Sequence, residues 1–231
     1  MKIAIMGAMA EEITPLLKFF KSYNEVVYAN NVYYETSYKD MEIVIAYSKI
    51  GKVNAALTAS SLIQKFGATK LLFSGVAGAV NDKLKIGDIL YATKLAQHDL
   101  DITAFGHPYG YVPGGAVYVD SDETLNKIAS KVAKEKGISL GAGIIATGDQ
   151  FVCDNARKEW VRKTFNADAL EMEGASVAVV CDALSVPFFI LRAISDAADM
   201  DAGFNFDKFL DSSAKISASF ITSMLDEIAH G

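Results

Sequence analysis

Two glutamates flank a single methionine in the stretch LEMEGASVA, which runs from Leu170 to Ala178 and is otherwise small or apolar. Carboxylates at the end of a buried strand can accept hydrogen bonds from ligand hydroxyls, and the vicinal hydroxyls of a sugar suit such a pair. The alternative is helix capping, since an acidic residue in a first helical turn gains roughly a few tenths of a kcal/mol from the helix dipole. Capping accounts for Glu173 but poorly for Glu171, so the pair favours a sugar-binding site.

A second polar group occurs in RAISDAAD, where Arg192 lies near the end of an apolar run and is followed by Ser195 and Asp196. Arg192 could form a buried ion pair with Glu12 or Glu173, or could use that pairing to orient a carboxylate that acts on water. Ser195 could hold the Asp196 carboxyl by a hydrogen bond, and the alternative is a helix N-cap or a turn. Because an exposed aspartate has a pKa of about 4, Asp196 can act as an acid only if it is desolvated or bonded to the group it protonates.

These residues need a scaffold, and the chain alternates apolar runs of strand length with stretches of helical periodicity. The predicted strands are Lys2–Gly7, Val32–Tyr38, Glu42–Tyr47, Lys70–Ser74, Asp88–Ala92, Gly143–Thr147, Ala167–Met172 and Pro187–Ser195. The predicted helices are Ala10–Lys21, Val53–Phe66, Asp122–Lys136, Asn155–Thr164, Glu173–Leu184 and Phe206–Ala229. The alternation predicts an α/β fold with a largely parallel sheet, covered by helices on both faces.

Most of the polar residues fall where a predicted strand ends. The segments concerned are Met9–Glu12, SGVAG at Ser74, TGDQFV at Thr147, EMEG at Glu171 and RAISDAAD at Arg192. Because ligands of open α/β sheets bind beyond the carboxyl ends of the strands, we expect these segments to share one site. Phe151 could be a platform for a stacked base or a core residue. Met9, Ile50, Met172 and Phe206 could likewise belong to the core or to a pocket wall.

Length, charge and composition narrow the class of protein. The 231 residues favour one domain, residues 1–231, and the formal net charge of −6 argues against nucleic acid as a partner. No apolar stretch reaches the ~20 residues of a membrane-spanning helix, so we expect no membrane association. Cys153 and Cys181 predict free thiols and a cytoplasmic location. His98, His107 and His230 form no metal-binding spacing with them, and we expect no structural zinc.

One long irregular stretch, Gln97–Val117, interrupts the alternation and contains FGHPYGYVPGG. Loops of this length in compact domains are usually functional or contact a partner. We therefore expect this stretch to take part in a site or an interface.

Two glycine-containing segments resemble phosphate-binding motifs, but each lacks a feature that the motif requires. GAGIIA at Gly141 spells a dinucleotide-binding motif, but it is expected to precede a strand instead of following one. SGVAG is a glycine-rich turn candidate without the lysine of a P-loop. Neither pattern predicts a nucleotide phosphate site.

Seven motifs in order carry a family resemblance over almost the whole chain. They are MKIAIMGAMAEEI at Met1, SKIGKVNAA at Ser48, SGVAG at Ser74, DLDITAFG at Asp99, GDQFV at Gly148, LEMEGASVA at Leu170 and RAISDAAD at Arg192. With them the chain resembles the bacterial 5′-methylthioadenosine/S-adenosylhomocysteine nucleosidases, and among these the Helicobacter–Campylobacter type that also cleaves 6-amino-6-deoxyfutalosine in menaquinone synthesis. The resemblance implies a nucleoside phosphorylase-like α/β fold with a mixed central sheet, a homodimer, and no metal or cofactor. It also implies irreversible hydrolysis of the N-glycosidic bond, with release of adenine.

The resemblance also implies catalytic roles for five residues. Asp196 resembles the general acid at adenine N7, held by Ser195. Glu12 resembles the group that positions and deprotonates the attacking water, with Arg192 beside it. Glu173 resembles the residue that binds the ribose hydroxyls.

Other matched positions are expected to surround the substrate. Those at the sugar and the base are Met172, Glu171, Ala77, Gly78, Phe151 and Val152, with Met172 packed on the sugar and Phe151 stacked on adenine. Those of the apolar 5′ pocket are Met9, Ile50 and Phe206, closed from the partner subunit by Phe105, His107 and Pro113. Two positions depart from the family pattern: Val76 stands where many members have serine, and His107 where an aromatic residue is common.

Two alternatives to hydrolysis stay open. A phosphorolytic purine or uridine phosphorylase on the same fold needs cationic donors for phosphate near the first strand, where this chain has Glu11 and Glu12. A non-catalytic nucleoside-binding protein is the other alternative, because a fold does not fix a function. Such a protein is expected to lack Asp196 or Glu12, and both are present.

Overall fold

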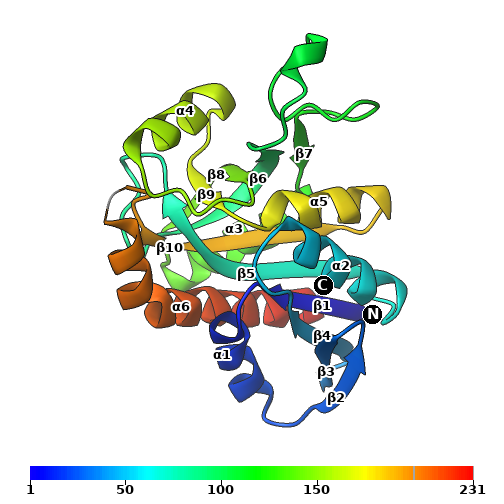
Figure 1. Ribbon diagram of the computed structural model, residues 1–231. Helices are drawn as coiled ribbons and strands as arrows, with labels where there is room; N and C mark the ends of the chain where they lie inside the picture. Colours follow the sequence, from blue (N-terminus) through cyan, green and yellow to red (C-terminus); the bar gives the residue numbers. More distant parts are fainter. Residues whose placement is uncertain (200, 231) are drawn as a thin grey trace.

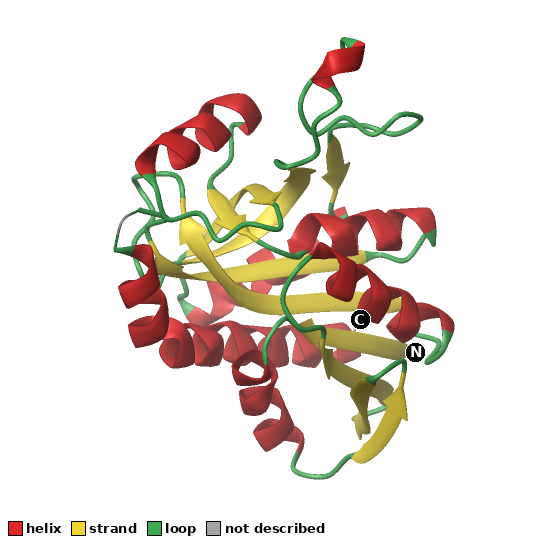
Figure 2. Cartoon of the chain, in the orientation of Figure 1, coloured by secondary structure: helices red, strands yellow, loops and turns green. Residues whose placement is uncertain are grey.

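The computed structural model describes residues 1–199 and 201–230, and in it one mixed sheet is covered by helices on both faces (Figures 1 and 2). Its strands are β1 Lys2–Gly7, β2 Asn24–Tyr28, β3 Asn31–Tyr38, β4 Met41–Tyr47, β5 Lys70–Ala79, β6 Ile89–Gln97, β7 Tyr118–Asp120, β8 Leu140–Thr147, β9 Ala169–Glu171 and β10 Phe188–Asp196. Its helices are α1 Ala10–Phe20, α2 Lys52–Gln64, the 3₁₀ turn η1 Thr103–Phe105, α3 Glu123–Lys136, α4 Asn155–Phe165, α5 Gly174–Ala183 and α6 Ala202–His230. The predicted mixed sheet with flanking helices is confirmed.

The sheet is partly closed on itself. Strands β4, β1, β5 and β10 are neighbours in that order and run parallel. Beyond β10 follow β6, which is antiparallel to it, and then β8 and β9, which are parallel to β6. Strand β9 returns to pair antiparallel with Gly78 and Ala79 at the end of β5. At one opening of the ring β5–β10–β6–β8–β9, strands that run in opposite directions therefore both contribute their ends. This opening is called the mouth of the ring below.

Alternating residues of β1 divide the core into two layers. Ile3 and Ile5 pack in the cluster formed with α1, α3 and α6, whereas Ala4 and Met6 pack in the cluster formed with α2 and α5. The buried stripe of α6, which includes Ile221 and Leu225, covers the first layer. Full burial of such a side chain stabilises the fold by roughly 1.5–3 kcal/mol. The two layers hold the strands rigidly at their carboxyl ends, where the polar residues lie.

Strand β5 is longer than predicted, and this changes the place of one motif. SGVAG lies inside β5 and is not a turn after it, whereas β10 ends at Asp196, one residue later than predicted. The reason is that β5 and β10 pair in parallel from Leu71 and Phe188 up to Gly78 and Asp196, so the glycines stay in ladder geometry. GAGIIA also lies within a strand, β8, and does not precede one.

Other boundaries differ at the ends of elements. The strand predicted at Ala167–Met172 is limited to Ala169–Glu171, and the last helix begins at Ala202 instead of Phe206. Strands β2 and β7 were not predicted, because β2 is mostly exposed and β7 has only three residues. The stretch Gln97–Val117 is irregular as expected apart from the end of β6 and η1, and it projects from the body of the molecule (Figure 1). Among the described helices, none has the length and apolar character needed to cross a bilayer.

Candidate active site

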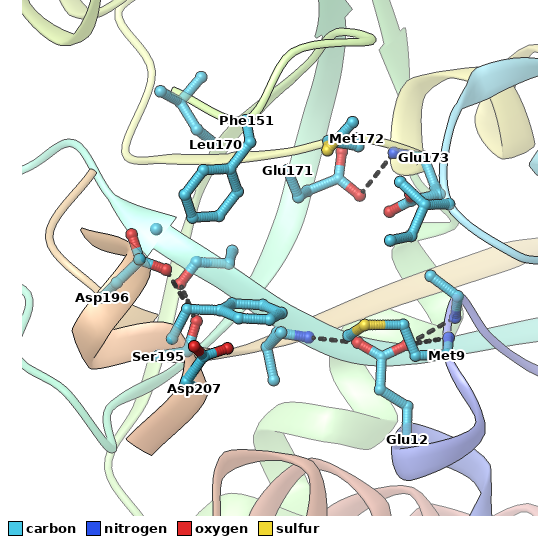
Figure 3. Close-up of a pocket in the computed structure, with 17 residues that line it drawn as sticks. Met9, Glu12, Phe151, Leu170, Glu171, Met172, Glu173, Ser195, Asp196 and Asp207 are labelled. Carbon is cyan, nitrogen blue, oxygen red and sulfur yellow. Dashed lines mark hydrogen bonds between the residues drawn. The ribbon is translucent and has the colours of Figure 1, made fainter. Parts of the chain in front are cut away.

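A cavity of about 480 Å³ lies at the mouth of the ring of strands (Figure 3). The predicted residues that line it are Met9, Glu12, Ile50, Ala77, Gly78, Phe151, Glu171, Met172, Glu173, Ser195, Asp196 and Phe206. They come from the ends of β1, β9 and β10, the second half of β5, the loop after β8, and the starts of α1, α2, α5 and α6. The expectation of a shared site is therefore met, although β9 enters from the opposite direction to β5 and not as a parallel neighbour.

Glu12 lies in the first turn of α1 and is buried against the end of β1. Its Oε2 accepts hydrogen bonds from the backbone N–H groups of Ala8 at 2.5 Å and Met9 at 3.1 Å. Its Oε1 accepts one from Val76 N–H at 3.0 Å. Burial raises the pKa of Glu12, while Arg192 and these three donors act in the opposite direction. The result is a fixed carboxylate with a raised pKa, as a general base requires.

Arg192 is paired with Glu171, and the predicted ion pair with Glu12 or Glu173 is wrong. Arg192 Nη2 donates to Glu171 Oε2 at 2.6 Å, and the guanidinium packs over the Phe73 ring at 4.0 Å. It also lies close to Glu12, because a Cβ on Gly75 would be 2.8 Å from Glu12 Oε1 and 3.1 Å from Arg192 Nη1. Arg192 itself lies behind the cavity wall. The partner differs from the prediction because β9 folds back on the end of β5 and brings Glu171 across from β10.

Glu171 is saturated by the protein. Besides Arg192, its carboxylate accepts hydrogen bonds from the Thr147 hydroxyl and from the N–H groups of Glu173 and Gly174. All four donors are protein groups, and three of them share Oε2, so Glu171 is held by the protein more firmly than Glu173 although both line the cavity. Its place agrees with a supporting role.

Glu173 stands at the N-cap position of α5 with its carboxyl group at the cavity. Within the described residues, the hydrogen bond that its side chain accepts is the one from Gly51 N–H to Oε1, at 2.8 Å. Burial raises the pKa of Glu173 to about 8, and the neighbouring carboxylates of Glu171 and Glu12 act in the same direction. One carboxylate oxygen thus remains for a ligand hydroxyl.

Asp196 ends β10 on the opposite side of the cavity from Glu12 (Figure 3). Ser195 Oγ donates to Asp196 Oδ2 at 2.9 Å, and Ala198 N–H donates to Oδ1 at 2.8 Å. Burial raises the pKa of Asp196 against these two hydrogen bonds. Gly78 gives the carboxyl group its space, since a Cβ there would lie 2.6 Å from Oδ1. The predicted Ser195–Asp196 contact is thus present, and Asp196 is desolvated as an acid at neutral pH must be.

The walls of the cavity are mainly apolar. The Phe151 and Phe206 rings meet edge to face at 5.7 Å, and Met172 lies on the side of Glu171 and Glu173 (Figure 3). Val152 is buried beside a small adjoining hollow behind Phe151. Ile50 is 54% exposed, so the cavity is open at that end.

Three predicted residues lie outside the cavity of their own chain. Phe105, His107 and Pro113 are in the projecting loop, where Phe105 is 79% exposed and His107 stacks on Tyr111. This placement leaves their predicted role at a partner's pocket as a prediction.

The sequence reasoning missed some of the lining residues, namely Ala8, Val76, Leu170, Gly203 and Asp207. Asp207 is the polar member, and the signal available for it was its position next to Phe206 at the start of a helix. Val76 was noted only for the hydroxyl it lacks, yet its backbone N–H holds Glu12.

Neither an anion-binding side chain nor a metal cluster is found at this site. No lysine or arginine lines the cavity in the described part of the chain. A search of residues 1–199 and 201–230 finds no group of three His, Cys, Asp or Glu side chains arranged to hold a metal ion.

The fold agrees with what comparison with known proteins finds. Residues 2–226 match the phosphorylase superfamily, and the chain belongs to that superfamily. It is 63% identical over 228 residues to the aminodeoxyfutalosine nucleosidase of Campylobacter jejuni, covering 99% of this chain and 100% of that one. It is 41% identical to the 5′-methylthioadenosine/S-adenosylhomocysteine nucleosidase of a Geobacillus strain, covering 99% of each.

The solved structures lead to the same family. The structure of the Helicobacter pylori 5′-methylthioadenosine/S-adenosylhomocysteine nucleosidase with butyl-thio-DADMe-Immucillin-A has a TM-score of 0.97 and 51% identity, covering 98% of both chains. Within the superfamily, this chain belongs with these nucleosidases and is an N-glycosidic hydrolase. The phosphorylase alternative is not favoured.

Proposed function

We propose that this chain hydrolyses the N-glycosidic bonds of 6-amino-6-deoxyfutalosine, 5′-methylthioadenosine and S-adenosylhomocysteine, and releases adenine. The observation that carries the proposal is the arrangement of Glu12 and Asp196 on opposite sides of one cavity, with Glu173 beside Glu12 (Figure 3). An adenine nucleoside laid across that space has its base toward Asp196 and its sugar toward the two glutamates. The names of the relatives supply the three substrates.

Asp196 acts as the general acid in this proposal. As the bond from C1′ to adenine N9 breaks, its electron pair moves into the purine, and the Asp196 proton passes to N7. The leaving group is then neutral adenine instead of an anion. General acid help of this kind contributes about 10²–10⁴ in rate. The raised pKa of Asp196 supports this role, because it favours the protonated carboxyl group.

Glu12 acts as the general base toward water. A water molecule attacks C1′ of the sugar and gives its proton to Glu12, so that adenine and the free sugar are the products. The three backbone donors fix the Glu12 carboxylate, and this fixed orientation is the support for its role.

Glu173 binds the ribose hydroxyls through the oxygen that Gly51 leaves free. Glu173 is active in its ionised form, whose charge, with that of Glu12, stabilises the positive charge that develops on the sugar as the bond breaks. The acidic lining also disfavours phosphate as the nucleophile, because an anion would find carboxylates and no lysine or arginine among the described lining residues.

The remaining contacts follow the shape of the cavity. Phe151 stacks on adenine, while the Val152 backbone reads the base edge from the adjoining hollow. Met172 packs on the sugar, with Ala77 and Gly78 beneath. Met9, Ile50 and Phe206 receive the 5′-substituent at the open end of the cavity.

The proposal includes a homodimer in which Phe105, His107 and Pro113 close the partner's 5′ pocket. Its support is that the loop projects from the body of the molecule (Figure 1), while its three residues do not line the cavity of their own chain. The cavity is open at Ile50, and Val53 and Leu57 of the neighbouring α2 are also exposed, at 78% and 51%. A partner subunit that covers this end would bury these apolar side chains.

The experiment incubates the purified chain with each of the three nucleosides and quantifies adenine and reducing sugar. We expect equimolar adenine and free sugar from 6-amino-6-deoxyfutalosine and from the two thioether nucleosides. Binding of the nucleosides without adenine release would assign the site to a non-catalytic binding protein and contradict the proposal.

A further inference from the structure

A polar cluster just outside the cavity joins three loops of the site. Its centre is Asp99, at the root of the projecting loop, with a side chain that is 24% exposed. Asp99 Oδ1 accepts a hydrogen bond from Lys52 Nζ at 2.6 Å, and Asp99 Oδ2 accepts one from Asp149 N–H at 2.8 Å. One carboxylate therefore fixes both the start of α2 and the loop that carries Phe151.

The cluster continues to the ribose-binding glutamate. Asp149 Oδ1 accepts a hydrogen bond from Lys52 N–H at 2.7 Å, and so caps α2, whose N-cap residue Gly51 has no side chain to do so. Gly51 N–H is then aimed at Glu173 Oε1. Gly51 needs its positive φ of 99° for this turn, and a Cβ there would lie 3.0 Å from Asp149 Oδ1.

We propose that Asp99 is a positioning residue of the hydrolase, which holds the Gly51 N–H on Glu173 and the Phe151 loop over the base through Lys52 and Asp149. The inference rests on the proposed role of Glu173 in binding the ribose. Asp99 touches no part of the cavity, so it acts only through these neighbours. Its partners lie on three separate segments, and no other described residue accepts from both Lys52 Nζ and Asp149 N–H.

The charges around Glu173 give this role a distinctive pH signature. Glu173 faces the Glu171 carboxylate from β9, Arg192 from β10 and Glu12 from α1, with the Gly51 N–H in front of α2. The hydrogen bond from Gly51 N–H favours the ionised form of the Glu173 carboxyl group and so acts to lower its pKa. If Asp99 is removed and Gly51 moves away, the pKa of Glu173 rises further. The loss of activity is then largest below the pKa of Glu173 and becomes smaller as the pH increases.

The test uses Asp99→Ala and Lys52→Met in the full chain, with kcat and KM measured from pH 5 to pH 10. The control is Lys94→Met with Asp120→Ala, an exposed Lys–Asp pair at 3.5 Å between β6 and β7 that lines no part of the cavity. We expect kcat/KM at pH 7 to fall about 10- to 100-fold in both Asp99→Ala and Lys52→Met, since small misplacements of substrate-holding groups have effects of this order. In both variants the acid limb of the pH profile of kcat/KM moves to higher pH. The control variants keep the wild-type profile.

Amide hydrogen exchange at Gly51 and Lys52 provides a readout that does not depend on activity. We expect faster exchange at both amides in Asp99→Ala and in Lys52→Met, and no change in the control. If Asp99→Ala does not fold, Lys52→Met decides the matter. Unchanged exchange and a wild-type acid limb in Lys52→Met would overturn the inference. A wild-type chain that releases no adenine would instead refute the proposed function, while the exchange experiment still decides whether Asp99 holds Gly51.

Discussion

Arg192 and Glu171 form an ion pair of 2.6 Å whose side chains are only 1% and 3% exposed. This pair brings the sole cation among the buried charges of the described core next to Glu12, Glu171 and Glu173, without exposing it in the cavity. Arg192 thus stabilises several carboxylates at once, while a substrate meets only acidic and apolar groups. The Arg192–Glu171 pair therefore explains how buried acidic side chains can line the cavity although no described lining residue is a lysine or an arginine.

Arg192→Met leaves Glu171 buried without its partner. Removal of one member of a buried pair destabilises a protein by roughly 3–5 kcal/mol, so we expect a loss of that size in the free energy of unfolding measured with urea. Lys127→Met, which breaks an exposed pair with Glu123, is the control and should leave the free energy of unfolding nearly unchanged. A loss below about 1 kcal/mol for Arg192→Met would show that the buried pair is not needed.

Glu173→Gln should stabilise the protein at alkaline pH. The folded-state pKa of Glu173 is raised to about 8 from its ordinary value of 4.5, so between these values the folded state holds a proton that the unfolded chain releases. Stability therefore falls as the pH rises through this window, and glutamine removes that loss. We expect a Tm higher than wild type by several degrees at pH 9, at about 2–4 °C per kcal/mol, and nearly equal at pH 4.5.

The same Glu173→Gln chain should bind and turn over nucleosides poorly, because an amide lacks the charge that stabilises the developing cation on the sugar. If wild type and Glu173→Gln had the same Tm at pH 9 as well as at pH 4.5, the raised pKa of Glu173 would be contradicted.

Asp196→Asn should lower turnover by about 10²–10⁴ without unfolding the chain, since the asparagine oxygen can still accept from Ala198 N–H and its NH₂ group can donate to Ser195 Oγ, but the amide has no acidic proton to give to N7. Ser195→Ala should have a smaller effect, because Ala198 N–H still holds Asp196. Single-turnover measurement of adenine release separates chemistry from product release. An Asp196→Asn chain with near-normal turnover would exclude Asp196 as the acid.

Mixing two inactive variants tests the proposed dimer. Phe105→Ala is expected to weaken the partner's 5′ pocket, and Glu12→Gln to inactivate its own. In a mixed dimer, the chain with Phe105→Ala keeps Glu12 and receives an intact Phe105 from its partner. We expect an equal mixture to recover about a quarter of wild-type activity, given random association into two-fold dimers. No recovery after exchange of subunits would mean that Phe105 does not serve a partner's site.

The elements that the sequence predicts well are those with a complete hydrophobic pattern. Strand β1 is a continuous apolar run and helix α6 has helical spacing in its core residues, whereas β2 has mostly exposed side chains and offers no such pattern. SGVAG was interpreted as a turn because its glycines are flexible in isolation. Pairing with β10 along its length keeps it in a strand, which local sequence does not reveal.

The site was predictable where a residue follows its own apolar run, as Glu12 and Asp196 do. Pairings between distant segments were not predictable in the same way. Glu171 reaches Arg192 only because β9 closes the ring against β5, and the Gly51 donor to Glu173 depends on how α2 starts. Asp207 was missed because, apart from its place next to Phe206, nothing in its sequence surroundings distinguishes it from an ordinary polar residue of a helix.

In the proposed reaction water, and not phosphate, receives the sugar. The decisive experiment runs the reaction in ¹⁸O-labelled water with and without excess inorganic phosphate and analyses the sugar by mass spectrometry. We expect a free sugar that carries ¹⁸O at C1 in both cases, at the same rate. A sugar 1-phosphate, formed at a rate that rises with phosphate, would contradict the proposed reaction.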